Sequence, residues 1–236
     1  MTYIGTAGRL AAAGAVISVA VLLSGCVSTV SGTAQRGQGA AQTDVPPLDA
    51  GDLDDVLLSI GEINRIMGAS TMEVTAELEE MTDNSGSVSD PGCLGAIYGA
   101  EDPVYAGSGW TDMLDQVARE PGDDNNHWVE QTAVLYPSAQ DAQQFFDDSV
   151  SMWESCANYT VAILDSNTEY YWDLGGVTVE DALVTQLTTQ QDADGWACQH
   201  ALSVVSNVTV ETWACGYSIT DEAAVIALDM VANAGR

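Results

Sequence analysis

Apolar residues recur three or four positions apart in three parts of the chain, as they do along one face of a helix. The first part covers residues 53–67 and stops at Gly68. The second follows Ser138, which forms a near capping box with Asp141. The third covers residues 221–234. In chain order, the predicted inner faces are Leu53, Val56, Leu57, Ile60, Ile63 and Met67; Ala142, Phe145, Phe146, Ser149, Trp153 and Cys156; and Val225, Leu228 and Ala232.

Runs rich in β-branched and aromatic residues predict strands at residues 128–136, 177–190, 196–205 and 208–217. The last two runs flank a Ser-Asn pair at 206–207, which we interpret as a tight hairpin turn. Helices and strands do not alternate strictly, and hairpins join the later strands. The pattern therefore predicts a single α+β domain with a twisted antiparallel sheet and flanking helices.

The patterns between the first helix and the first of these strands are weaker. Residues 72–81 are acidic and fit a helix or a loop, and residues 82–92 form a polar turn region. Residues 97–105 are short and ambiguous, with a strand as one interpretation. We expect a short helix at residues 111–119 and a loop at residues 121–126.

The N-terminus has the pattern of an export signal. Behind Arg9, residues 10–23 form an unbroken apolar or small-residue run, shorter than the roughly 20 residues that a membrane span needs. The run ends in the lipobox-like sequence LSGC, whose cysteine is Cys26. We expect cleavage after residue 25, a lipid thioether on Cys26, and anchoring at the extracytoplasmic face of the cell membrane. A secreted protein with a chance cysteine and a retained transmembrane anchor are the alternatives.

Composition limits the possible partners. After the signal at residues 1–25, residues 26–47 form the lipidated cysteine and a flexible linker, and residues 48–236 form one domain. The formal net charge is −30, from 35 acidic and 5 basic residues. So acidic a surface repels phosphate backbones, which excludes nucleic acid as a partner. It also repels anionic headgroups, so membrane attachment depends on the lipid.

Four cysteines follow the lipobox, and in an exported chain an even number predicts two disulfides. Four cysteines allow three pairings. If the Ser-Asn pair is a two-residue turn, Cys198 and Cys215 face each other as a non-hydrogen-bonded pair with close Cα atoms. We therefore pair Cys198 with Cys215 and, by elimination, Cys93 with Cys156.

No catalytic motif, zinc-ligand spacing, Walker loop or dinucleotide fingerprint is present, so we expect no enzyme, no metal site and no cofactor. His127 ends an acidic loop at residues 123–127, where a hard cation is conceivable but EF-hand spacing is missing. His200, opposite Trp213 in the predicted hairpin, fits a sheet-surface residue. A cell-wall hydrolase would need two carboxylates across a cleft, which a sequence so rich in acids neither indicates nor excludes.

A family resemblance rests on residues in a fixed order: Leu57, Leu58, Pro91, Cys93, Tyr105, Trp110, Gln131, Ala142, Trp153, Cys156, the stretch GWACQHA at 195–201, Asn207, Val208, Ala214, Cys215 and Gly216. With these, the chain resembles the PknH-like extracellular sensor domains over about residues 53–232. Such domains occur on a mycobacterial Ser/Thr kinase and on stand-alone mycobacterial lipoproteins. His200 departs from the pattern, because many relatives are expected to have Arg there. The resemblance implies two disulfides paired in sequence order and a cleft that serves as a ligand site.

The chain has 6 Trp and 8 Tyr against 2 Phe, and Trp and Tyr suit half-exposed pockets as well as cores. The candidate cleft residues are Tyr105, Trp110, Gln131 and Trp172. We expect a lipid-anchored, sensor-like binding protein that captures a small molecule or a cell-wall component. The alternative is a partner-binding or structural envelope lipoprotein that modulates a membrane kinase or another envelope protein.

Overall fold

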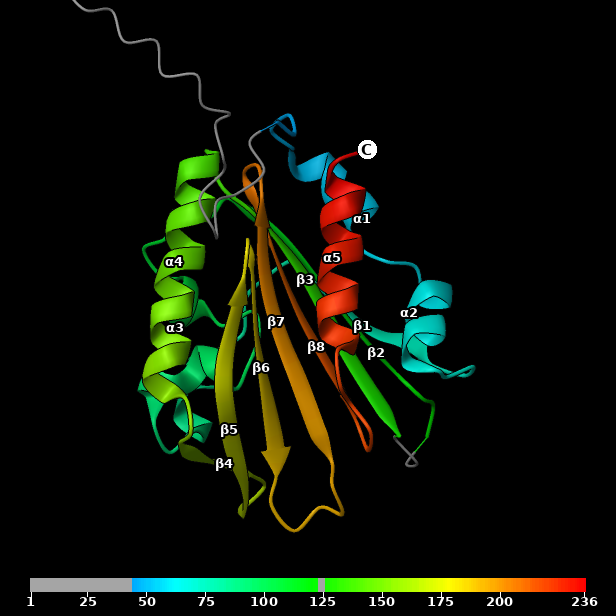
Figure 1. The fold of residues 1–236 in the computed structure, drawn as a ribbon, viewed down its shortest axis with the longest axis vertical. Helices are drawn as coiled ribbons and strands as arrows, with labels where there is room; N and C mark the ends of the chain where they lie inside the picture. The colour runs from blue at the N-terminus through cyan, green and yellow to red at the C-terminus, as the bar shows by residue number, and fades with distance from the viewer. Residues whose placement is uncertain (1–43, 123–125) are drawn as a thin grey trace, which may run out of the picture. The chain divides into compact units, whose positions relative to one another are not determined.

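The computed structural model describes residues 44–122 and 126–236. The predicted signal peptide, Cys26, the linker up to residue 43 and residues 123–125 of the acidic loop lie outside this range. The described chain forms one eight-stranded antiparallel sheet with helices on both faces, the α+β class that the sequence predicts (Figure 1). No helix within these ranges is long and apolar enough to cross a bilayer.

The sheet order is β1-β2-β3-β8-β7-β6-β5-β4, so the hairpin of the last two strands lies near its middle. The strands are β1 (Glu73–Leu78), β2 (Asp112–Arg119), β3 (His127–Leu135), β4 (Thr160–Asp165), β5 (Thr168–Glu180), β6 (Leu183–Gln190), β7 (Ala197–Val205) and β8 (Val208–Gly216). The helices are α1 (Leu53–Val56), α2 (Ile60–Met67), α3 (Asp102–Tyr105), α4 (Ala139–Cys156) and α5 (Glu222–Ala234), with 3-10 turns η1 (Ala50–Asp52), η2 (Ser85–Ser87) and η3 (Pro91–Ala96).

Alternate residues of the central strands supply two hydrophobic cores, one on each face of the sheet. On one face, Val210 and Ala214 of β8 pack with Ile226 and Met230 of α5, next to α1 and α2. On the other face, α4 packs over β7 and β5, as Figure 1 shows. Its buried residues are the six that the helical spacing predicts: Ala142, Phe145, Phe146, Ser149, Trp153 and Cys156.

Both disulfides join the cysteines that the sequence pairs. Cys198 and Cys215 are opposite each other in the β7–β8 ladder, with Cα atoms 4.0 Å apart. Cys93 in η3 is bonded to Cys156 at the end of α4, with Cα atoms 5.7 Å apart. The second bridge fixes η3 against the helix that covers the sheet.

The predicted continuous helix over residues 53–67 is wrong, because it breaks into α1 and α2 at Leu58. The side chain of Gln131 in β3 binds both polar groups of the Leu58 backbone. Its Oε1 accepts from the Leu58 N–H at 2.8 Å, and its Nε2 donates to the Leu58 carbonyl at 2.9 Å. Those two groups are therefore unavailable to a helical ladder.

The predicted short helix at residues 111–119 is wrong as well, because this segment is strand β2. Asp115 and Gln116 interrupt its apolar alternation, and burial of the Asp115 side chain was not foreseeable from its type. Residues 72–81 contain strand β1, and residues 97–105 end in helix α3 without a strand. Residues 177–190 are two strands, β5 and β6, rather than one.

The expected inner face of the last helix is also wrong. Val225 and Leu228 are exposed, at 36% and 51%, and Ala232 is exposed too. Ile226 and Met230 face the sheet instead. Because α5 has apolar residues on most of its circumference, spacing alone does not determine which side faces inward.

Candidate functional site

The sheet face that carries α4 also carries a cavity of about 570 Å³. Ligand sites are typically concave, mostly apolar and of this size. Its walls hold six aromatic side chains: Tyr98, Trp128, Tyr170, Trp172, Trp196 and Trp213. Four of the six Trp residues of the chain therefore gather there, and the other two are Trp110 and Trp153.

The β7–β8 hairpin forms the floor of the cavity. Cys198 and Cys215 line it, and Trp213 lies two residues before Cys215 on the same face of β8. Across the ladder to β3, Trp213 is opposite Glu130 and Cys215 is opposite Trp128. The hairpin register therefore determines which aromatic and acidic side chains meet at the floor.

Four carboxylates also line the cavity: Glu101, Asp115, Glu130 and Asp165. Among the described lining residues there is no Lys, Arg or His. Glu101 is buried and accepts hydrogen bonds from the Thr82 hydroxyl and the Asn84 backbone N–H. Neutral donors thus satisfy both of its carboxyl oxygens.

Asp115 and Glu130 have fewer favourable contacts. The Thr132 hydroxyl donates to Asp115 at 2.6 Å, but burial raises the pKa of Asp115 to about 6. Burial, together with the negative charges of Asp115 and Glu211, raises the pKa of Glu130 well above its usual range. The cavity therefore holds two carboxyl groups that resist ionisation together.

Glu211, which does not line the cavity, lies in a polar cluster beside Trp213. Tyr105 Oη donates to Glu211 Oε2 at 2.7 Å, and the Ala100 N–H donates to the same oxygen at 3.3 Å. His200 Nε2 lies 2.8 Å from Glu211 Oε1. The His200 ring stacks on Trp213, with centroids 3.8 Å apart.

The expectation that His200 is a sheet-surface residue is wrong, because the side chain is completely buried. Its position opposite Trp213 is confirmed. Burial lowers the pKa of His200, which favours a neutral ring that donates from Nε2. Its Nδ1 then has no partner among the residues that the structure describes.

The indole N–H of Trp213 is a further unpaired group. Trp213 is 3% exposed, and its Nε1 finds no hydrogen-bond partner in the described part of the chain. Gly99 covers this edge of the ring, and a Cβ there would lie 3.1 Å from Nε1 and 3.3 Å from Glu130 Oε2. A glycine thus permits close approach of the loop to both groups.

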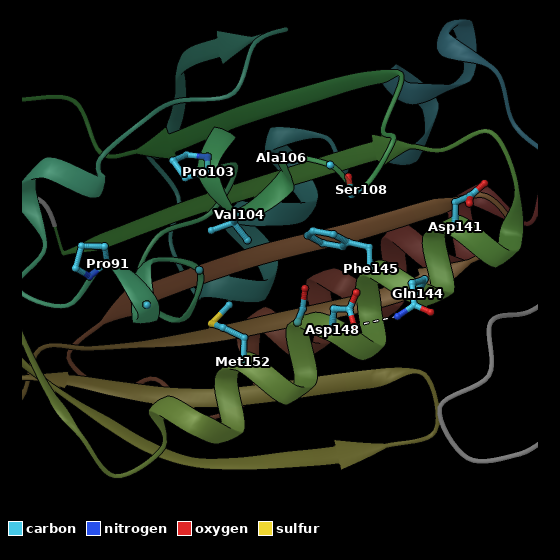
Figure 2. A pocket seen from close by; sticks show the side chains of 14 residues that line it. Pro91, Pro103, Val104, Ala106, Ser108, Asp141, Gln144, Phe145, Asp148 and Met152 are labelled. Atoms are coloured by element: carbon cyan, nitrogen blue, oxygen red, sulfur yellow. Dashed lines mark hydrogen bonds between the residues drawn. The ribbon is translucent and has the colours of Figure 1, made fainter.

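A second cavity, of about 550 Å³, lies between α4 and the η3–α3 segment. Figure 2 shows Val104, Phe145 and Met152 at its centre. The polar side chain of Gln144 at its edge donates to Asp148 at 2.9 Å. It has one aromatic lining residue, so the cavity with the tryptophans is the stronger candidate site.

The structure does not bring the four predicted cleft residues together. Trp172 lines the tryptophan cavity. Tyr105 is buried behind it, on Glu211. Gln131 is buried on the opposite face of the sheet, on Leu58, and Trp110 packs partly buried beside the α4 core.

Sequence reasoning missed Asp115, Glu130 and Trp213 as a group. The hairpin register, extended to β3, could have placed Trp213 in the cavity floor. Nothing in the sequence distinguished Asp115 and Glu130 from the other acids. Asp115 lies on β2, which was not predicted as a strand, and Glu130 reaches the floor through the pairing of β3 with β8.

Within residues 44–122 and 126–236, no three His, Cys, Asp or Glu side chains converge as metal ligands. His127 Nδ1 lies 2.6 Å from Glu120, a pairing that accounts for its position beside the acidic loop.

The fold and the cavity define a disulfide-bonded α+β domain with an aromatic, acidic pocket on one sheet face. The family model for the PknH-like extracellular domain matches residues 48–233. The chain therefore belongs to the PknH-like extracellular domain family, as its sequence motifs suggest.

Relatives support this membership. The chain is 40% identical, over 179 residues, to the serine/threonine-protein kinase PknH of Mycobacterium tuberculosis strain H37Rv and to that of Mycobacterium bovis. The match covers 76% of this chain and about 30% of those kinases. The crystal structure of the extracellular domain of PknH from Mycobacterium tuberculosis superposes with a TM-score of 0.77 at 38% identity, covering 80% of this chain and 98% of that one.

Proposed function

We propose that this protein is a lipid-anchored, extracytoplasmic, sensor-like domain that captures a small molecule or a cell-wall fragment in the tryptophan cavity. The observation that carries the proposal is the cavity itself: about 570 Å³, lined by four Trp side chains above a disulfide. Large aromatic rings bury much apolar area at low cost in conformational entropy, which suits a preformed binding site.

The binding function has a direct test. The purified full-length protein is screened with cell-wall fragments, sugars, lipids and small organic ions by thermal shift and tryptophan fluorescence. A ligand that binds only the folded state raises the melting temperature, and the stabilisation grows with the logarithm of one plus the ratio of ligand concentration to Kd. Trp172→Ala should abolish that shift, and Tyr171→Ala should not, because Tyr171 is exposed on the same strand and does not line the cavity.

The absence of any saturable ligand in a folded protein would contradict this function. It would favour the partner-binding alternative, which one observation supports. Tyr171 and Leu187 are exposed at 45% and 43% on neighbouring strands β5 and β6, outside the area that α5 covers. Exposed apolar side chains in one region are typical of interaction surfaces.

The lipid anchor is tested separately. Cys26→Ala should block lipidation and cleavage, so the protein should lose lipid labelling and keep residues 1–25. A variant that is still cleaved after residue 25 and stays on the membrane would contradict the lipobox interpretation.

A further inference from the structure

We propose that the tryptophan cavity selects an organic cation, with a substituted ammonium group held against the indole rings beside Glu130 and Asp115. This inference rests on the proposed binding function and adds the chemical class of the ligand. It follows from the joint placement of aromatic faces and uncompensated carboxyls in one cavity.

The cavity is lined by several indole rings. Trp128, Trp172 and Trp196 are partly buried around the Cys198–Cys215 disulfide and line the cavity. The face of an indole ring is electron-rich and attracts cations, most strongly where water is excluded. Several such rings around one volume favour an ammonium group whose charge is spread over alkyl substituents.

Three other acidic side chains act on Glu130. Asp115 approaches it from β2, Glu211 from β8 and Glu101 from the loop before α3, and all three raise its pKa. His200 of β7 is stacked behind Trp213 and bonded to Glu211. No described cationic side chain therefore compensates Glu130, and an ammonium group in the cavity would supply the missing charge.

Trp213 provides a second, independent sign of an incomplete site. Its N–H is buried at the cavity wall beside Gly99 and lacks an acceptor among the described residues. A ligand oxygen that displaces the Gly99 loop slightly would satisfy it. A small cation that also carries a hydroxyl thus matches the groups present.

Other ligand classes fit less well. Anions would meet four carboxylates and no base in the described lining. Inorganic divalent cations need several converging ligands, and the described chain offers no such set. The mostly apolar walls would also fail to replace the hydration shell of a small inorganic ion.

The test uses choline and its uncharged isostere 3,3-dimethylbutan-1-ol, which has the same shape and hydroxyl group. Binding to the full-length protein is measured by tryptophan fluorescence and calorimetry at pH 7. We expect choline to bind at least tenfold more tightly than the isostere. Glu130→Gln should weaken choline at least tenfold and leave the isostere unchanged.

A matched control separates a local effect from the overall charge of −30. Glu180→Gln removes one negative charge at an exposed position outside the cavity, so it should leave choline affinity within twofold of the parent. Choline affinity should also rise from pH 5.5 to pH 8, because protons compete with the cation for Glu130 and Asp115. The isostere should show no such dependence.

Several outcomes would overturn the inference. Equal affinities for choline and the isostere would mean that the cavity recognises the shape of the ligand and not its charge. Equal losses in Glu130→Gln and Glu180→Gln would mean that only diffuse charge attracts the cation. If choline does not bind but another compound of the screen binds in a way that depends on Trp172, the proposed binding function is supported and the cation inference is refuted. If nothing binds, both fall.

Discussion

Replacing Asp115 with Asn should stabilise the protein at neutral pH. Burial raises the pKa of Asp115 from 3.8 to about 6. Each unit of pKa difference corresponds to about 1.4 kcal/mol, so ionised Asp115 destabilises the folded state by about 3 kcal/mol. Asn has nearly the same shape, can accept the hydrogen bond from Thr132, and carries no charge beside Glu130.

The gain in the free energy of unfolding from Asp115→Asn should depend on pH, because the folded and unfolded states bind protons differently. The folded-state pKa of Asp115 is raised, so between pH 4 and pH 6 the folded protein binds more protons than the unfolded chain. The stability of the parent therefore falls across this window. Below pH 4 the carboxyl is protonated in both states, and the substitution should have little effect. Above pH 6 the gain should reach its full size of about 3 kcal/mol.

Urea unfolding of the parent and D115N at pH 4, 5, 6 and 7 measures this difference. Asp112→Asn, at an exposed position of the same strand, corrects for the lower net charge. A gain that is the same at pH 4 and pH 7, or that the Asp112 control reproduces, would refute the reasoning. So would a destabilised D115N variant at pH 7.

Three further variants test the contacts that hold the fold together. Replacing Cys93 and Cys156 together by Ala opens a 63-residue loop and should cost about 4 kcal/mol by the loop-entropy model, measured by urea unfolding with and without reductant. Tyr105→Phe removes the hydrogen bond that Tyr105 Oη donates to Glu211, so it should lower the free energy of unfolding by about 2 kcal/mol, seen as a lower urea midpoint with the same slope. Gly175→Ala would place a Cβ 2.6 Å from a β6 backbone oxygen and should destabilise by more than about 1 kcal/mol; an unchanged melting temperature would contradict the contact.

The sequence predicted the parts of the fold that depend on local spacing. Two such parts are the buried face of α4 and the register of the β7–β8 hairpin, which pairs Cys198 with Cys215. A helical repeat and a two-residue turn each fix which side chains share a side, without knowledge of the rest of the chain.

Predictions from local spacing were wrong where contacts between distant segments determine the structure. Residues 53–67 have a helical period, yet the side chain of Gln131 takes both backbone groups of Leu58 and divides the helix. Asp115 and Gln116 made β2 resemble a polar helix, although pairing with β3 buries Asp115. The Leu58–Gln131 contact joins residues 73 positions apart, and the Asp115–Thr132 contact joins residues 17 positions apart, so no periodic pattern encodes them.

Contacts between distant segments also determine which residues line the candidate site, so most of these residues were not predicted from the sequence. Sequence motifs drew attention to Tyr105 and Gln131, which do not line the tryptophan cavity. Tyr105 is bonded to Glu211, and Gln131 is bonded to the Leu58 backbone. Asp115 is buried and Glu130 is half-buried, so both depart from the rule that core positions are apolar, and sequence patterns therefore place them at the surface. Natural proteins depart from such rules mainly where function requires it. The proposed cation site would explain such a departure at buried Asp115 and half-buried Glu130, because an ammonium group there would supply a positive charge that no described lining residue provides.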